Sequence, residues 1–334
     1  MRMKEIAALA LLLVLCICPG CDRFVAVTGY AQGGTYSVKI NLKGVRVKRT
    51  EIASSIDSIL TLVDTTLSGY NKSSQLSRFN AGEPIVPNRL FADIYAYSRD
   101  IWEETGGCVD VAAGPLFDIW GFGFSNDSLP SDDRVRMVLE SCGMARLSPA
   151  ITPGSTLVTG GERINFNAIA QGYTCDLVAD YLRSIGVEDM LVDIGEIYCS
   201  GHNPSGRDWS IGVDRPVDGN DTPGADLDGI WLSGGRSCGI VTSGNYRKFY
   251  VRDGHKYSHT IDPRTGYPVE DSLLSATIVA PTAAAADAYA TYCMVLGFEG
   301  ARSFIEGRPD LEGYLIRDVD GTMVEWASPG FTLR

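Results

Sequence analysis

The chain has 334 residues, with 29 Lys and Arg against 41 Asp and Glu, and therefore a formal net charge of −12. Its 45% hydrophobic and 21% charged residues are typical of a globular protein and exclude collagen, a coiled coil and wholesale disorder. An acidic chain is a poor ligand for polyanions, because phosphate backbones are bound by clustered Lys and Arg, so we expect no nucleic-acid partner.

Residues 1–20 have the pattern of an export signal. Positive charge in the first four residues precedes an apolar stretch over residues 6–18, which is too short for a stable membrane-spanning helix. We predict a signal peptide over residues 1–20 and a mature domain over residues 21–334. A Cys directly after a small residue resembles a bacterial lipobox, in which the thiol is acylated. We therefore expect lipidation at Cys21 and an exported protein, lipid-anchored to the bacterial cell membrane and facing the periplasm.

Six cysteines follow Cys21 at wide and irregular intervals, without paired CxxC motifs. This spacing indicates neither a zinc site nor a dense disulfide framework, and isolated cysteines are most often small buried hydrophobes. Cys18 and Cys21 do form a CxxC, but a redox motif belongs beside a folded βαβ unit rather than inside an export signal.

The order of apolar residues predicts a mixture of helices and strands. Alternation predicts a strand over residues 35–40. Helical spacing and capping residues predict helices over residues 52–67, 91–102, 131–143, 169–185 and 282–296. Short apolar runs broken by Gly, Asn-Pro and Asp predict several strands over residues 191–251, a loop at 219–224, and strands near 314–317 and 323–326. Because the two kinds of element do not alternate regularly, we predict an α+β fold in one compact domain.

Several common catalytic motifs are missing from the sequence. It has no GxGxxG after a strand, no GxxxxGK[ST], no HExxH and no GxSxG, which excludes the common nucleotide-binding folds and the zincins. The three histidines, at 202, 255 and 259, argue against a multi-histidine metal centre. Any metal is therefore expected to be hard and bound by oxygen.

The densest cluster of polar residues lies over residues 241–249 and 255–268. Gly and Pro residues set tight turns there, and hydroxyls, the His259 imidazole, the Asp262 carboxylate and Arg264 fall within about fifteen positions. Composition alone gives equal weight to a functional site and to a solvated hairpin loop.

Five ordered motifs resemble those of one known family. Residues 259–266, HTIDPRTG, together with residues 242–247, TSGNYR, resemble the signature of the ApbE family, the FAD:protein FMN transferases. Residues 34–38, 68–80, 109–123 and 168–176 resemble further motifs of this family. The matches run from about residue 33 to 330, so the chain is identified as a member of the ApbE family. The resemblance implies a single compact ApbE-like domain, α+β, with a mixed, largely antiparallel sheet and packed helices.

The resemblance also implies a reaction. In this family a Thr (or Ser) hydroxyl of a partner protein attacks the FMN-side phosphorus of FAD, which leaves FMN linked through a phosphoester and releases AMP. Positioning the pyrophosphate and neutralising its charge supply most of the rate in such a transfer. The implied partners are FAD and acceptor proteins with a Thr-containing flavinylation motif, in particular membrane redox subunits. Two other functions stay open: hydrolysis of FAD to FMN and AMP, and a flavin-binding carrier without turnover.

The implied cofactor is Mg²⁺, bound by the backbone carbonyl of Ala168 and by the side chains of Asp287 and Thr291. Asp287 and Thr291 are four residues apart, so their oxygens would project from one face of the predicted helix. Without the resemblance, the same two residues are better explained as a polar stripe on an Ala-rich helix.

For FAD, the resemblance implies contacts with Gly33, Tyr70, Cys108, Val109, Asp110, Asn165, Gln171 and Ile261. Tyr70 offers a flat apolar face to a flavin or adenine ring, although it could also be a half-buried core residue. Asn165 and Gln171 are neutral amides at positions where relatives often carry charged residues. Residues 192–197, VDIGEI, have one Gly where the family has two before the acidic residue, so we expect the facing of Glu196 to be reversed unless a bulge absorbs the difference.

His259 is the best candidate for a general base, because imidazole ordinarily titrates near neutrality. Asp262 is the competing candidate, and a structural role for His259 in capping the turn is a further alternative. Arg264 could neutralise phosphate charge or could brace Asp262.

Overall fold

An eight-stranded antiparallel sheet forms the centre of the structure, a computed structural model that describes residues 24–334 except 124–128, 221, 247–248 and 253–254. The strand order is β1-β2-β3-β4-β7-β10-β11-β12, and every neighbouring pair is antiparallel. The strands are β1 Phe24–Ala31, β2 Gly34–Asn41, β3 Met190–Asp193, β4 Ile197–Ser200, β7 Cys238–Gly244, β10 Leu273–Ala280, β11 Glu312–Val319 and β12 Thr322–Ala327. The predicted signal peptide and Cys21 lie outside the described residues.

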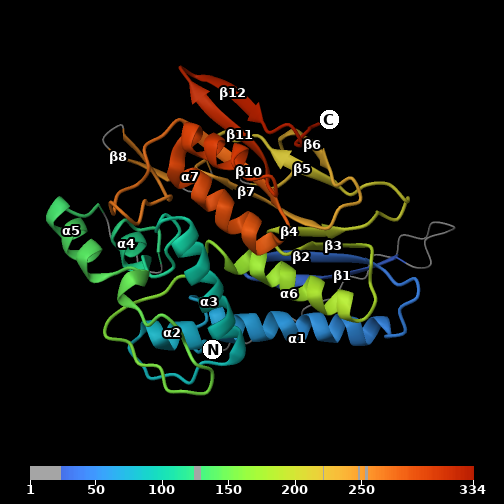
Figure 1. Cartoon of the computed structure of the whole chain (residues 1–334), viewed down its shortest axis with the longest axis horizontal. Helices are drawn as coiled ribbons and strands as arrows, with labels where there is room; N and C mark the ends of the chain where they lie inside the picture. Colours follow the sequence, from blue (N-terminus) through green and yellow to red (C-terminus); the bar gives the residue numbers. More distant parts are fainter. Residues whose placement is uncertain (1–23, 124–128, 221, 247–248, 253–254) are drawn as a thin grey trace, which may run out of the picture.

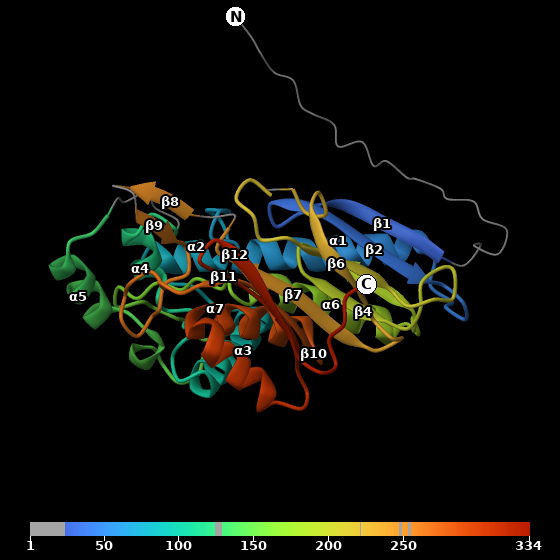
Figure 2. The ribbon, with the colours of Figure 1, turned by 90° about the horizontal axis from the view of Figure 1, so that it is seen from above.

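Within the described residues, two small sheets and seven α-helices surround this centre (Figure 1). The small sheets pair β5 Ser210–Asp214 with β6 Leu227–Leu232, and β8 Phe249–Arg252 with β9 His255–Ser258. The helices are α1 Arg49–Leu67, α2 Gln75–Asn80, α3 Arg89–Glu104, α4 Gly114–Ile119, α5 Asp132–Ser141, α6 Ala170–Ser184 and α7 Ala283–Glu306. Figure 2 shows β8 and β9 at the same end of the molecule as α4 and α5, whereas β1 and β2 lie toward the other end.

Each face of the sheet is covered by a different layer. Helix α6 packs between the sheet and α1 (Figure 1), and its apolar stripe, which includes Val178 and Leu182, belongs to one buried cluster with Val38 and Val192. On the opposite face Trp209, directly before β5, and Trp231 of β6 belong to a second cluster. The predicted α+β architecture is confirmed.

The start of α7 is held by close contacts to two other backbones. A Cβ atom at Gly239 of β7 would lie 2.3 Å from the Cα atom of Ala283, and one at Gly172 of α6 would lie 2.3 Å from the Ala283 carbonyl oxygen. The Asp176 carboxylate on α6 accepts hydrogen bonds from the N–H groups of Ala283 (2.9 Å) and Ala284 (2.8 Å). These contacts fix where the next turns of α7 point.

The structure confirms the predicted helices and extends the last one. Ser131 caps α5 through its side chain, as its position predicts. The predicted end of the Ala-rich helix at residue 296 coincides with a break at Gly297, where φ is 70°, after which α7 continues to Glu306. Among the described residues, none of the helices has both the length and the apolar character needed to cross a bilayer.

Candidate active site

A cavity of about 1550 Å³ gathers segments from the whole length of the chain. Its walls come from the β1–β2 turn, the end of α1, the loop after α3, the start of α6, the end of β7 and the middle of α7. The residues predicted for FAD, metal and catalysis all line it: Gly33, Tyr70, Cys108, Val109, Asp110, Asn165, Ala168, Gln171, His259, Ile261, Asp287 and Thr291. The structure therefore brings together residues up to 258 positions apart, while their individual roles stay predictions.

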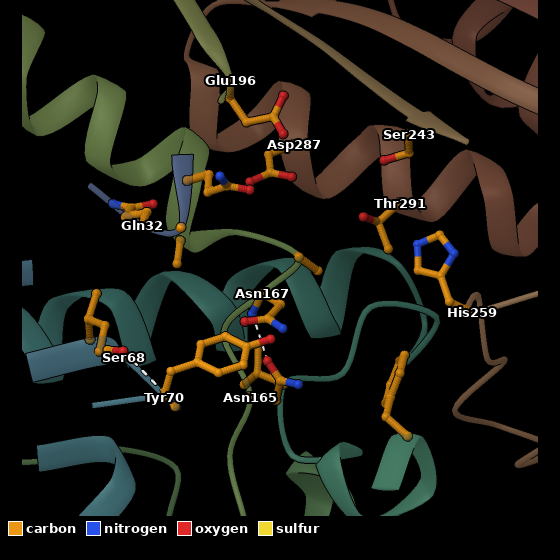
Figure 3. Close-up of a pocket in the computed structure, with 18 of the residues that line it drawn as sticks. Gln32, Ser68, Tyr70, Asn165, Asn167, Glu196, Ser243, His259, Asp287 and Thr291 are labelled. Atoms are coloured by element: carbon orange, nitrogen blue, oxygen red, sulfur yellow. Dashed lines mark hydrogen bonds between the residues drawn. The ribbon is translucent and has the colours of Figure 1, made fainter. Parts of the chain in front are cut away.

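Asp287 and Thr291 project from α7 into this cavity, one helical turn apart (Figure 3). Asp287 is 5% exposed, and its Oδ2 atom accepts a hydrogen bond from the N–H of Gly172 at 3.1 Å. Burial raises the pKa of Asp287 to about 7, against the lowering effect of the Gly172 hydrogen bond, and the nearby Asp176 raises it further. A bound cation would stabilise the charged form of such a carboxylate.

The oxygen donors around Asp287 fit a hard cation. The N–H of Gly172 lies in the first turn of α6, where backbone N–H groups have no acceptor within the helix, and it donates to Asp287. Helix α6 begins at Ala170, so the Ala168 carbonyl precedes its first turn. In the part of the chain that the structure describes, no group of three or more His, Cys, Asp or Glu is placed to hold a metal. The predicted donor set, one carboxylate, one hydroxyl and one carbonyl, suits Mg²⁺ better than zinc.

Tyr70 and Asn165 lie on the wall opposite α7 (Figure 3). The Tyr70 side chain is 74% exposed, which excludes the alternative of a half-buried core tyrosine. Ser68 Oγ accepts hydrogen bonds from the N–H groups of Tyr70 (3.2 Å) and Asn71 (3.0 Å), which fix the backbone of the turn that carries the ring. Asn165 Oδ1 accepts from the N–H of Asn167 at 2.9 Å. The exposed ring offers a flat face on which a planar ligand can stack.

Asp110 holds the loop after α3 in shape. Its Oδ1 atom accepts from the N–H of Ala112 at 2.8 Å, and its Oδ2 atom accepts from the N–H of Met144 at 2.9 Å. Burial raises the pKa of Asp110, and these backbone hydrogen bonds oppose that shift. Its carboxylate therefore fixes the backbone on which Cys108 and Val109 face the cavity.

Glu196 lies in a hairpin turn rather than in a strand, which corrects the expected reversal of its facing. Asp193 pairs with Ile197, and the N–H of Ile194 donates to the Glu196 carbonyl at 3.0 Å. A difference of one residue here changes the length of the turn and leaves the facing of both strands unchanged. Glu196 lines the cavity near Asp287 (Figure 3).

Of the two base candidates, His259 is the one that lines the cavity. Its ring meets Phe122 edge-on, with centroids 6.4 Å apart. Asp262 is paired with Arg264: its Oδ2 atom accepts from Nη2 at 2.8 Å and its Oδ1 atom from Nε at 3.0 Å. The predicted alternative in which Arg264 braces Asp262 is thus the one the structure contains.

Other polar residues line the cavity without being predicted. Gln32, in the β1–β2 turn, has a left-handed backbone with φ of 52° and donates from Nε2 to Thr174 Oγ1 at 2.6 Å. The hydroxyls of Thr242 and Thr277 share a 2.8 Å hydrogen bond between β7 and β10, and Thr242 also lines the cavity. The glycine-rich sequence after Gln32 indicates a turn, but it carries no signal for contact with α6.

Comparisons with known proteins identify the family of this chain. The model of the ApbE family matches residues 33–315. The FAD:protein FMN transferase of Escherichia coli K12 is 32% identical over 303 residues, which cover 88% of this chain and 84% of that protein. The FAD:protein FMN transferase of Vibrio cholerae is 33% identical over 336 residues, which cover 98% of this chain and 97% of that protein. The solved flavin transferase ApbE from Vibrio cholerae superposes with a TM-score of 0.76 at 30% identity, covering 92% of this chain and 97% of that one. The apo flavinyl transferase ApbE of Pseudomonas stutzeri gives 0.79 at 29% identity, covering 92% and 95%. The chain belongs to the ApbE family.

Proposed function

We propose that this chain is a Mg²⁺-dependent FAD:protein FMN transferase that moves FMN from FAD onto a Thr (or Ser) hydroxyl of a partner protein and releases AMP. The observation that carries the proposal is the single cavity in which the buried Asp287 and the hydroxyl of Thr291 face the exposed ring of Tyr70. A cavity with a planar apolar wall opposite hard oxygen donors suits a ligand that joins flat rings to a pyrophosphate.

The transfer exchanges one bond to the FMN-side phosphorus of FAD for another. The acceptor hydroxyl oxygen forms a bond to the FMN-side phosphorus, and the bond from that phosphorus to the bridging oxygen breaks, so that AMP leaves. The hydroxyl proton passes to His259 Nδ1 or Nε2, at the end of β9 where the ring faces the cavity. Mg²⁺, when held by Asp287, Thr291 and the Ala168 carbonyl, would neutralise pyrophosphate charge. Tyr70 and the loop at Cys108–Asp110 bind and orient FAD.

One experiment separates transfer from the two alternatives. The purified protein is incubated with FAD, Mg²⁺ and a candidate acceptor that carries a Thr-containing motif. Covalent flavin fluorescence on the acceptor in a denaturing gel, together with free AMP, supports the transferase. Free FMN and AMP without labelled acceptor would indicate hydrolysis, and bound FAD without AMP would indicate a carrier.

We also propose that the protein is exported and anchored by a lipid on Cys21, with membrane redox subunits as acceptors. The support is the sequence pattern of residues 1–21. Mass spectrometry of the mature protein is expected to find residues 1–20 removed and Cys21 acylated. An unmodified N-terminus on a chain recovered without membranes would contradict the anchor.

A further inference from the structure

Two cysteines face each other across neighbouring strands of the central sheet. Cys199 is on β4 and Cys238 is on β7, and the two residues are direct partners in the antiparallel register. Their Sγ atoms are 3.9 Å apart. Cys199 is 0% exposed and Cys238 is 5% exposed, within the cluster beneath β5 and β6. Among the six cysteines of the described chain, all of them free, this is the pair whose thiols are in contact.

The register suits a disulfide. Directly opposed residues of an antiparallel pair have Cα atoms about 4.5 to 5.5 Å apart, which lies inside the range of about 4.4 to 6.8 Å found across disulfides. The two sulfurs at 3.9 Å must approach by about 2 Å to bond, a movement within reach of rotation about the two Cα–Cβ bonds. The backbone of β4 and β7 therefore need not move.

The pair lies where the sheet is joined most weakly. Strands β4 and β7 pair at three positions only, whereas β7 and β10 pair at six. This short ladder links the strands β1 to β4 with the strands β7 to β12. Both strands also lead to the cavity, since Glu196 precedes β4 and Thr242 and Ser243 belong to β7. A covalent link at Cys199 and Cys238 would hold the two halves of the sheet together.

The surroundings also favour reaction at one of the two sulfurs. The hydrogen bond with Cys199 lowers the pKa of the Cys238 thiol and the nearby Arg236 lowers it further, against the raising effects of burial and of Glu312. The neighbouring pair toward the end of the sheet, Ser200 and Ser237, is joined by a 2.8 Å hydroxyl contact at the surface. Cys238 is thus one residue from solvent, at the end of a strand, where pairing opens most readily.

We propose that Cys199 and Cys238 form an intramolecular disulfide that joins β4 to β7, made by exchange with a disulfide oxidant such as an exported thiol–disulfide oxidoreductase or glutathione disulfide. The Cys238 thiolate attacks one sulfur of the oxidant, and a mixed disulfide forms as the other sulfur leaves as a thiolate. The Cys199 sulfur then attacks Cys238, and the oxidant's second sulfur leaves. Two protons and two electrons pass from the cysteine pair to the oxidant, which becomes a dithiol or two thiols. The proposal does not depend on flavin transfer.

Peptide mapping tests the link directly. The full chain is reduced, freed of reductant, and oxidised with glutathione disulfide both in the native state and during refolding; free thiols are then alkylated and the protein is digested without reduction. We expect one linked pair of peptides, containing Cys199 and Cys238 and lighter by two hydrogen atoms than the sum of the reduced peptides. Alkylated Cys199 and Cys238 after both treatments, or a link from either residue to another cysteine, would overturn the proposal.

Thermal unfolding without FAD supplies a second readout. The disulfide closes a loop of about forty residues, so the oxidised protein should unfold about 5 to 10 °C above the reduced protein. Cys199→Ala and Cys238→Ala should each abolish this difference, whereas Cys142→Ala, which removes a buried cysteine directly after α5, should keep it. A difference that persists in Cys199→Ala contradicts the assignment, and if that variant does not fold, the peptide map of the unaltered chain still decides.

Discussion

The backbone N–H of Gly172, at the start of α6, donates a 3.1 Å hydrogen bond to Asp287 Oδ2 on α7. This contact joins the two helices at the point where both face the cavity, and it sets the direction of the Asp287 carboxylate independently of any ligand. A substitution at Asp287 therefore has to preserve this bond if its effect on the reaction is to be separated from its effect on the fold.

Asp287→Asn is expected to retain the fold and to lose FMN transfer by at least about 100-fold, because a hard cation supplies several kcal/mol of charge stabilisation in such sites. The amide oxygen can still accept from Gly172 while the charge is lost. Flavinylation of an acceptor is measured by in-gel fluorescence across a Mg²⁺ titration. Glu306→Gln is the matched control, since Glu306 is a carboxylate on the same helix paired with Arg302. Unchanged turnover of Asp287→Asn at saturating Mg²⁺ would refute the metal assignment.

His259→Ala should lower the single-turnover rate of flavinylation by about 10² to 10⁴-fold with little change in FAD affinity, if its ring accepts the hydroxyl proton. FAD titration by flavin fluorescence and a pH profile of the transfer rate measure the two quantities separately. His202→Ala, at an exposed position outside the cavity, is the control. A near-normal rate with an unchanged pH profile argues against a base at this position, and joint loss of binding and rate indicates a role in bracing the turn.

Tyr70→Ala should raise the Kd for FAD by about 10 to 100-fold, since stacking of a planar ring on an exposed aromatic side chain contributes about 1 to 3 kcal/mol. Tyr70→Trp, which keeps a flat face, should restore most of the affinity. Fluorescence quenching of FAD gives both constants. Equal affinity of the Ala variant and the unaltered protein would show that FAD does not stack on this wall.

The buried carboxylate of Asp176 should make the free energy of unfolding depend on pH. Burial raises its pKa to about 6, although the N–H groups of Ala284 and Ala283 lower it. The unfolded chain releases this proton near pH 4, so between about pH 4 and 6 the native state binds more protons, and the contribution of Asp176 to stability falls as pH rises. Relative to Asp176→Asn, the unaltered protein should lose about 2 kcal/mol of unfolding free energy across this window.

Denaturant unfolding at several pH values, with divalent cations chelated, measures this difference. Glu306→Gln removes an exposed carboxylate from α7, one that pairs with Arg302, and serves as the control. A difference between the unaltered protein and Asp176→Asn that stays constant from pH 4 to 6 would show that Asp176 does not titrate in this range.

Part of the fold follows from local sequence patterns. Helices such as α1 and α6 bury one face each, so apolar spacing predicts them. Strand β10 is buried along almost its whole length and has no alternation of apolar and polar residues, and α4 has only six residues, so neither carries a periodic signal. Alternation also does not predict β1, at the edge of the sheet.

The residues of the candidate site, unlike the helices and strands, cannot be predicted from apolar spacing. The family, and with it the transferase reaction, is confirmed by the relatives. Eleven of the twelve cavity residues are predicted from motif resemblance rather than from periodicity, and His259 is predicted from the chemistry of imidazole. Gln32 could not be predicted, because its contact with Thr174 spans 142 positions and depends on how the β1–β2 turn packs on α6. The Cys199 and Cys238 pair likewise depends on the register of β4 against β7.

The glycine contacts at the start of α7 restrict how this region can change during evolution. Any side chain at Gly172 or Gly239 would collide with backbone atoms of residues 282–284, and backbone cannot rotate away as a side chain can. Single replacements at either glycine are therefore blocked unless α7 itself is displaced. Displacing α7 would also move the side-chain oxygens of Asp287 and Thr291, which lie about one and two turns after its start. Helices α6 and α7 and strand β7 can therefore change their relative positions only together.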